Sequence, residues 1–206
     1  MSRPPNFLIF MTDQQRGDTV PPMGRAPTPN LTRFAREGVT FSRAFCPSPH
    51  CCPSRATFFS GLFPSEHGVW NNVDVGNALS RGLFDGVRLF SEDLKDAGYD
   101  LHFSGKWHVS AVETPVDRAW RMTGAPKPGL PRGELNRPRP YEWEQYENLQ
   151  PTPATRGEGE ILRPGYGSYS HYGIRENPFG DEAVIADGAQ ELRKRRRGDG
   201  PWCQFV

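Results

Sequence analysis

A continuous apolar run, FLIFM at residues 7–11, is followed directly by the polar cluster TDQQR at residues 12–16. Five consecutive apolar residues are expected of a strand that is buried on both faces of a parallel sheet. Polar residues just after such a strand lie beyond its carboxyl end, where the sites of open α/β sheets gather. The stretch therefore predicts a central parallel strand with Asp13 at its mouth, next to a functional crevice.

Strand and helix patterns alternate along the rest of the chain, which favours an α/β fold with a mostly parallel sheet. Further strands are expected at residues 39–45, 101–103 and from 201 onward. Helices are expected from Pro29 to Gly38, from Pro53 with residues 58, 59, 62 and 63 on one face, from Phe90 to Gly98, and over 181–197. Residues 109–180 show no period and are rich in Pro and Gly, as in a long functional loop or a disordered one.

Length and composition limit the class of protein. The 206 residues are enough for one sizeable core, and we treat 1–206 as one domain portion. With 25 basic and 24 acidic side chains, the net charge of +1 implies no nucleic-acid partner. The basic run 193–197 is expected at the C-terminus of a helix, where cations are common because they interact favourably with the helix dipole. No apolar run is long enough for a membrane span or a signal-peptide core, so we expect a cytoplasmic protein without a membrane partner.

The stretch HCCPSRATFFSG, residues 50–61, carries the strongest chemical signal. Pro53 suits the first turn of a helix, and the free N–H groups of a helix N-terminus favour an anion. The thiol of Cys51 and the guanidinium of Arg55 are expected one helical turn apart at this position. Buried structural cysteines are the competing interpretation. A zinc site is less favoured because the clustered residues lack paired C-x-x-C spacing, and four cysteines make no disulfide framework. The clustered residues are Cys46, His50, Cys51, Cys52 and His67.

The motif Cys-x-Pro-Ser-Arg, followed by an apolar pair and Gly, resembles the signature of the type I sulfatases. The resemblance implies an alkaline-phosphatase-like three-layer α/β sandwich with a mostly parallel sheet. It also implies that Cys51 is converted to formylglycine by a formylglycine-generating enzyme, with Cys52 at the variable position, and that Arg55 stabilises the charged hydrate. His50 and Ser60 depart from the commonest pattern.

The same resemblance assigns a metal to the end of the first strand. Asp13 matches the first ligand, Gln14 stands where a second acid is usual, and position 51 is also a ligand. Calcium is the expected ion. The amide of Gln14 at this position resembles a variant seen in branches of the superfamily where manganese is a candidate, and magnesium is a further possibility. From the residues alone, a turn or cap role is the more favoured interpretation of Asp13.

The stretch Gly-Lys-Trp-His at residues 105–108 resembles the second sulfatase signature. By that resemblance Lys106 grips a sulfate oxygen and His108 hydrogen-bonds the formylglycine hydroxyl, roles that suit a point charge and a neutral-pH proton carrier. Asn72 falls where relatives contact the substrate oxyanion, although Asn71, or a plain turn, fits as well.

The resemblance covers mainly residues 5–110, with a continuation at 181–206. We therefore expect an N-terminal portion whose C-terminal part is missing, and an incomplete active site in the chain alone. The predicted function is hydrolysis of a small-molecule or saccharide sulfate ester. The alternatives are a phosphonate or phosphate monoester hydrolase of the same superfamily, or an inactive truncated domain whose Cys51 stays a thiol.

Overall fold

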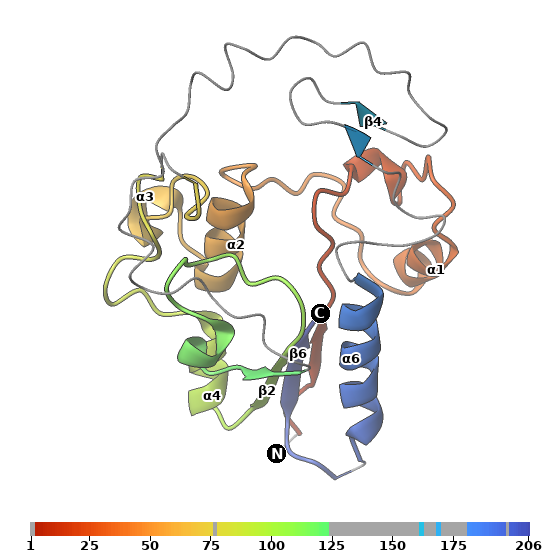
Figure 1. The fold of residues 1–206 in the computed structure, drawn as a ribbon. Helices are drawn as coiled ribbons and strands as arrows, with labels where there is room; N and C mark the ends of the chain where they lie inside the picture. Colours follow the sequence, from red (N-terminus) through yellow and green to blue (C-terminus); the bar gives the residue numbers. More distant parts are fainter. Residues whose placement is uncertain (1–2, 76–77, 124–160, 163–167, 170–180, 197) are drawn as a thin grey trace.

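The main sheet of the protein has four parallel strands in the order β1-β6-β2-β3 (Figure 1). The computed structural model describes residues 3–75, 78–123, 161–162, 168–169, 181–196 and 198–206. Strand β6 (Trp202–Phe205) lies between β1 (Phe7–Ile9) and β2 (Asp100–Phe103), and β3 (Arg121–Met122) pairs with the far side of β2. The predicted parallel sheet is confirmed, and the last strand in sequence is central in space.

Helices and short elements connect and flank these strands. Their bounds are η1 Gly17–Thr19, α1 Pro29–Glu37, α2 Cys51–Ser60, α3 Pro64–His67, α4 Phe90–Asp96, η2 Pro115–Arg118 and α6 Asp181–Lys194. A separate antiparallel pair consists of β4 (Ile161–Leu162) and β5 (Ser168–Tyr169). No helix among the described residues is long and apolar enough to cross a bilayer.

Helices cover both faces of the main sheet, which makes three layers (Figure 1). On one face α6 lies so close to β6 that a Cβ on Gly188 would come within 2.7 Å of a Val206 methyl carbon. The Gln204 side chain crosses this contact and donates a hydrogen bond of 2.6 Å to the Gly188 carbonyl. On the other face, α2 places the Phe59 ring 5.2 Å from the Phe205 ring of β6. The predicted three-layer α/β arrangement is confirmed.

Phe59 is the centre of the core on that second face. Its side chain is fully buried, and its ring centroid lies 4.9 Å from Trp107 and 5.5 Å from Phe90. Phe103 and Phe205, paired across β2 and β6, stack at 4.6 Å beneath it. Aromatic groups at these separations combine large buried area with favourable ring contacts. The core thus ties helix α2 to the segment that follows β2.

Two expectations about the N-terminal region were wrong. Strand β1 exists, but it is an edge strand paired only with β6 in the part of the chain described, and Phe7, Leu8 and Phe10 are 40%, 52% and 57% exposed rather than buried. Residues 39–45 form no strand: Val39 and Phe41 are about 80% exposed and pair with nothing described. Alternating apolar residues make a strand only where a neighbouring strand accepts their backbone hydrogen bonds.

The other helices were predicted close to their observed bounds. Helix α2 begins two residues before Pro53 and ends at Ser60. Gly61 caps it with a φ of +72°, a conformation that glycine adopts without strain because it has no Cβ, so residues 62 and 63 lie beyond the helix. Most of the segment predicted to be irregular, residues 124–160, 163–167 and 170–180, lies outside the described residues. Its described part is more regular than expected, because η2, β3 and the β4–β5 pair fall within 109–180.

Candidate active site

The N-terminus of α2 presents Cys51 at the first helical position, directly after His50. No side chain of His50 caps the helix, so the first N–H groups need other acceptors. One acceptor comes from a distant loop, because the Asn72 side-chain oxygen accepts a hydrogen bond of 3.1 Å from the Cys52 N–H. Asn72 thus lies at this helix end, with its oxygen used as a cap.

The two adjacent cysteines have different surroundings. Cys51 is half-buried, whereas Cys52 is completely buried, and its sulfur accepts a contact of 3.4 Å from the Val73 N–H. Burial raises the pKa of Cys52 to about 11, which holds it as a neutral thiol. Cys51 is therefore the more accessible sulfur of the pair, consistent with the expected assignment of position 51.

Arg55, one turn after Cys51, points into the protein. The residue is only 6% exposed. Its guanidinium donates hydrogen bonds to the backbone carbonyls of Lys106 and Trp107, the latter at 3.5 Å. It also lies 6.0 Å from the centre of the Phe205 ring. Burial lowers the Arg55 pKa, and Asp13 and the two cysteines oppose this shift. Arg55 therefore joins α2 to the loop that carries Lys106 and His108.

Lys106 and Asp13 form an ion pair beyond the carboxyl ends of the strands, since Asp13 follows β1 and Lys106 follows β2. The Lys106 ammonium donates a hydrogen bond of 2.7 Å to an Asp13 carboxylate oxygen, and both side chains are about 40% exposed. Partial burial disfavours both charges, but the mutual attraction outweighs it, so the pKa of Lys106 is raised and that of Asp13 lowered. Cys51 also contributes to the raised pKa of Lys106, which places this ammonium beside the helix end.

His108 faces a residue that sequence reasoning missed. Its backbone has a φ of +53°, and its Nε2 atom lies 3.1 Å from the Asp74 carboxylate, which is half-exposed. Asp74 belongs to no recognisable motif, and it meets His108 only because the loop after α3 folds back over the start of α2. No motif or spacing in the sequence points to Asp74 as a site residue. The predicted residues Cys51, Arg55, Lys106 and His108 lie around one end of α2.

The sulfatase family model, described as "Sulfatase", matches residues 5–202. The chain belongs to the sulfatase family. One relative, the uncharacterized sulfatase YidJ of Escherichia coli, is 38% identical over 108 residues, which are 51% of this chain and 20% of that protein. This sulfatase chain thus spans about a fifth of the length of the first curated relatives it matches.

Solved structures share the fold over almost the whole chain. The phosphonate monoester hydrolase of Agrobacterium radiobacter superposes with a TM-score of 0.59 and 21% identity, covering 98% of this chain and 41% of that one. A protein solved in complex with its substrate D-glucosamine-2-N,6-O-disulfate gives a TM-score of 0.58 and 22% identity, covering 98% and 33%. The expected alkaline-phosphatase-like fold is thereby confirmed for this sulfatase chain.

The predicted metal ligands are only partly suited to a hard cation. Asp13 and Gln14 are adjacent and exposed, and Gln14 has a φ of +48°. Calcium takes about six to eight oxygen ligands and magnesium about six. Two side chains, one of them paired with Lys106, do not make such a shell, so the described residues of this sulfatase do not by themselves fit the metal.

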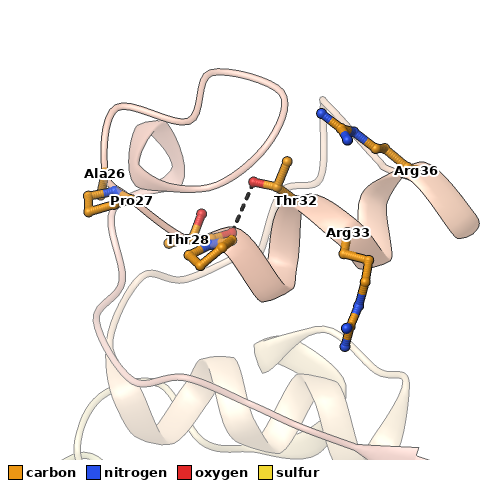
Figure 2. A pocket seen from close by; sticks show the side chains of 7 residues that line it. Ala26, Pro27, Thr28, Thr32, Arg33 and Arg36 are labelled. Atoms are coloured by element: carbon orange, nitrogen blue, oxygen red, sulfur yellow. Dashed lines mark hydrogen bonds between the residues drawn. The ribbon is translucent and has the colours of Figure 1, made fainter.

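A hollow of about 460 Å³ lies elsewhere, at the start of α1. Figure 2 shows Thr28, Thr32, Arg33 and Arg36 around it, with the Thr32 hydroxyl donating to the Thr28 carbonyl at 2.9 Å. The two arginines point in different directions and converge on no common point (Figure 2). None of the predicted site residues lines this hollow, so it is not the candidate active site.

Proposed function

We propose that this protein is a sulfuric ester hydrolase whose nucleophile derives from Cys51. The observation that carries the proposal is the convergence of Cys51, Arg55 and the Lys106–Asp13 pair at the N-terminus of α2. Membership of the sulfatase family supports the same reaction. An accessible residue at a helix N-terminus, flanked by fixed cations, suits attack on an anionic ester.

Position 51 would act after conversion of its thiol to formylglycine. When so converted, it would supply a hydrated aldehyde. One hydroxyl would attack sulfur and displace the alcohol of the ester, and the second hydroxyl would then lose its proton as the carbonyl re-forms and the sulfate leaves, which restores the aldehyde. This divides one difficult displacement into two easier steps. Cys52 is unsuited to that role because its side chain is fully buried in the core beneath the loop of Val73.

Lys106 would bind and neutralise the transferring sulfate. Its ammonium is partly exposed and lies beside position 51, while Asp13 holds it by a hydrogen bond of 2.7 Å. The raised pKa keeps this ammonium protonated throughout the neutral range. A fixed cation near the position where negative charge develops stabilises the transition state without reorganisation.

Arg55 and His108 would support this chemistry from either side. Arg55 fixes the backbone of Lys106 and Trp107, and its buried charge favours negative charge at position 51. His108, half-buried beside Asp74, would exchange a proton with the hydroxyl at position 51. Asn72 would orient the helix end and contact the substrate oxyanion through its remaining amide group.

The family generally uses a divalent metal, and we propose calcium, with manganese and magnesium as alternatives. Asp13 and Gln14 would supply oxygen ligands, with position 51 as a further ligand. Because these residues do not complete a coordination shell, we assign no step of the reaction to the metal.

The proposed substrate class is a small-molecule or saccharide sulfate ester. A structural neighbour was solved with the sulfated sugar D-glucosamine-2-N,6-O-disulfate as its substrate, which supports the saccharide option. The test is to express the full-length protein with a formylglycine-generating enzyme and to compare an aryl sulfate with a phosphonate monoester. We expect faster sulfate release, a loss of at least ~100-fold in Lys106→Ala, and no loss in Cys46→Ala, whose exposed thiol contacts the Ser48 carbonyl.

Hydrolysis of phosphonate or phosphate monoesters is the second candidate. It is favoured by Gln14, which replaces a carboxylate by a neutral amide, and by the structural likeness to a phosphonate monoester hydrolase. Faster turnover of the phosphonate ester would support it over the sulfatase assignment. An inactive domain with an unmodified thiol at position 51 predicts that neither ester is hydrolysed.

A further inference from the structure

The Asp74 carboxylate faces the imidazole ring of His108 beside the start of α2. One of its oxygens lies 3.1 Å from Nε2 of His108, an ordinary distance for a hydrogen bond or an ion pair. A ring nitrogen of His108 also lies within 4.8 Å of the sulfur of Cys52, the residue that follows position 51. Asp74 therefore stands directly behind the side chain that carries protons in the proposed reaction.

The two ring nitrogens of His108 have different surroundings. Both atoms are shielded from solvent, and neither has an aligned hydrogen bond within the described part of the chain. Nε2 has the Asp74 carboxylate at 3.1 Å, and the hydrogen bonds of catalytic groups are often imperfectly aligned before the substrate binds. An ionised carboxylate can only accept a hydrogen bond. A neutral ring paired with it therefore carries its proton on Nε2 and keeps the lone pair of Nδ1 free.

The backbone on both sides of this contact is held in place. Asn72 caps the first turn of α2, and the next residue directs its N–H at the Cys52 sulfur at 3.4 Å. Arg81 donates hydrogen bonds of 2.7 and 3.0 Å to the carbonyls of the residues before and after Asp74. His108 has a φ of +53°, in a region that residues with side chains adopt only where their surroundings fix it. The carboxylate is thus presented to the ring from a fixed loop.

We propose that Asp74 is the positioning residue of His108: it holds the Nε2 proton and leaves Nδ1 as the atom that exchanges a proton with position 51. This inference rests on the proposed function. A base that is itself oriented by a third group is the general arrangement around an activated nucleophile. The proton passes from a hydroxyl at position 51 to Nδ1, and Asp74 stays ionised and stabilises the imidazolium. The ring afterwards releases this proton to water.

Nuclear magnetic resonance of the 206-residue chain, labelled with ¹⁵N-histidine, tests the pair without any turnover. Because Nε2 is shielded from solvent, its proton should exchange slowly and give a downfield N–H resonance at pH 8. We expect this resonance in the parent chain and in the control Asp85→Asn, which removes an exposed carboxylate from the same α3–α4 connection. His108→Gln, which assigns the resonance, and Asp74→Asn should both lose it. A parent chain without it, nitrogen shifts that place the proton on Nδ1, or an unchanged resonance in Asp74→Asn would overturn the proposal.

Kinetics of the protein converted to formylglycine show whether Asp74 acts through His108. Asp74→Asn should lower kcat for the sulfate ester ~10–100-fold with KM little changed, because general acid–base catalysis contributes ~10²–10⁴-fold and a badly oriented ring keeps part of it. Added to His108→Gln, the same substitution should lower kcat no further, since its effect passes through a side chain already removed. A further loss in the double variant, or a rise in KM alone, contradicts the positioning role. A parent protein that hydrolyses no ester overturns the proposed function, and the resonance still decides the pairing.

Discussion

Asp100 at the start of β2 links this strand to β3 and to the segment after α6, and its replacement by Asn should destabilise the protein measurably. Its carboxylate lies 2.8 Å from Arg195 after α6, 2.8 Å from Nε2 of His102 and 3.2 Å from Arg121 of β3. Burial opposes ionisation, but these hydrogen bonds and charges outweigh it and lower the pKa of Asp100 from 3.8 to about 2.

The magnitude follows from the difference between the folded and unfolded pKa values. A shift of this size corresponds to ~2.4 kcal/mol, and since the side chain is 35% exposed, solvent screening reduces it to ~1–2 kcal/mol. A lowered folded pKa stabilises the protein fully above the unfolded value of 3.8 and loses this effect as the pH falls towards 2. About half of it should remain at pH 3.

The assay is urea unfolding of the parent chain and of Asp100→Asn at pH 7 and pH 3, followed by circular dichroism. The matched control is Asp93→Asn, because Asp93 pairs with Arg88 through a contact of the same length, 2.8 Å, with both side chains more than half exposed. We expect the control to cost less than ~0.5 kcal/mol. An Asp100→Asn variant as stable as the parent at pH 7, or a difference that does not shrink at pH 3, would refute the reasoning.

Three further predictions concern the core and the helix end. Phe59→Ala should lower the free energy of unfolding by ~3–5 kcal/mol in urea titrations, because the fully buried ring contacts Trp107 and its neighbours; a cost below 1 kcal/mol would contradict this packing. Asn72→Ala should cost ~1 kcal/mol while Asn72→Asp, which keeps the capping oxygen, should not, and equal costs would argue against the cap. Iodoacetamide at pH 8 should label Cys51 well before Cys52, whose buried thiol has a pKa of about 11, and equal labelling would contradict that environment.

The sequence predicted the fold well where the local pattern and the tertiary surroundings agree. Helix α1 ends next to Gly38, as expected, and α4 ends at Asp96, two residues before the expected Gly98. The apolar alternation at residues 101–103 is buried on the sheet as β2. The strand expected at 39–45 failed because periodicity carries no information about which strand would pair with it. The burial expected for Phe7 to Phe10 failed because β1 is an edge strand in the described sheet.

The site was predictable as far as its residues belong to motifs. Lys106 and Asp13 come from motifs at two strand ends, and they do meet, because parallel strands bring their carboxyl ends together. Asp74 was missed because it has no spacing relation to His108 and reaches it only through the fold of a loop. The inward direction of Arg55 was also hidden, since it depends on the carbonyls that α2 meets in the core.

Tandem mass spectrometry of the tryptic peptide 44–55 tests the central claim most directly, after expression with a formylglycine-generating enzyme and alkylation of free thiols. This peptide contains Cys46, Cys51 and Cys52, so the intact mass alone cannot place the change and the fragment ions must do so. The account predicts an aldehyde at position 51 and alkylated cysteines at 46 and 52. Alkylated thiols at all three positions, or an aldehyde at 52, would contradict it.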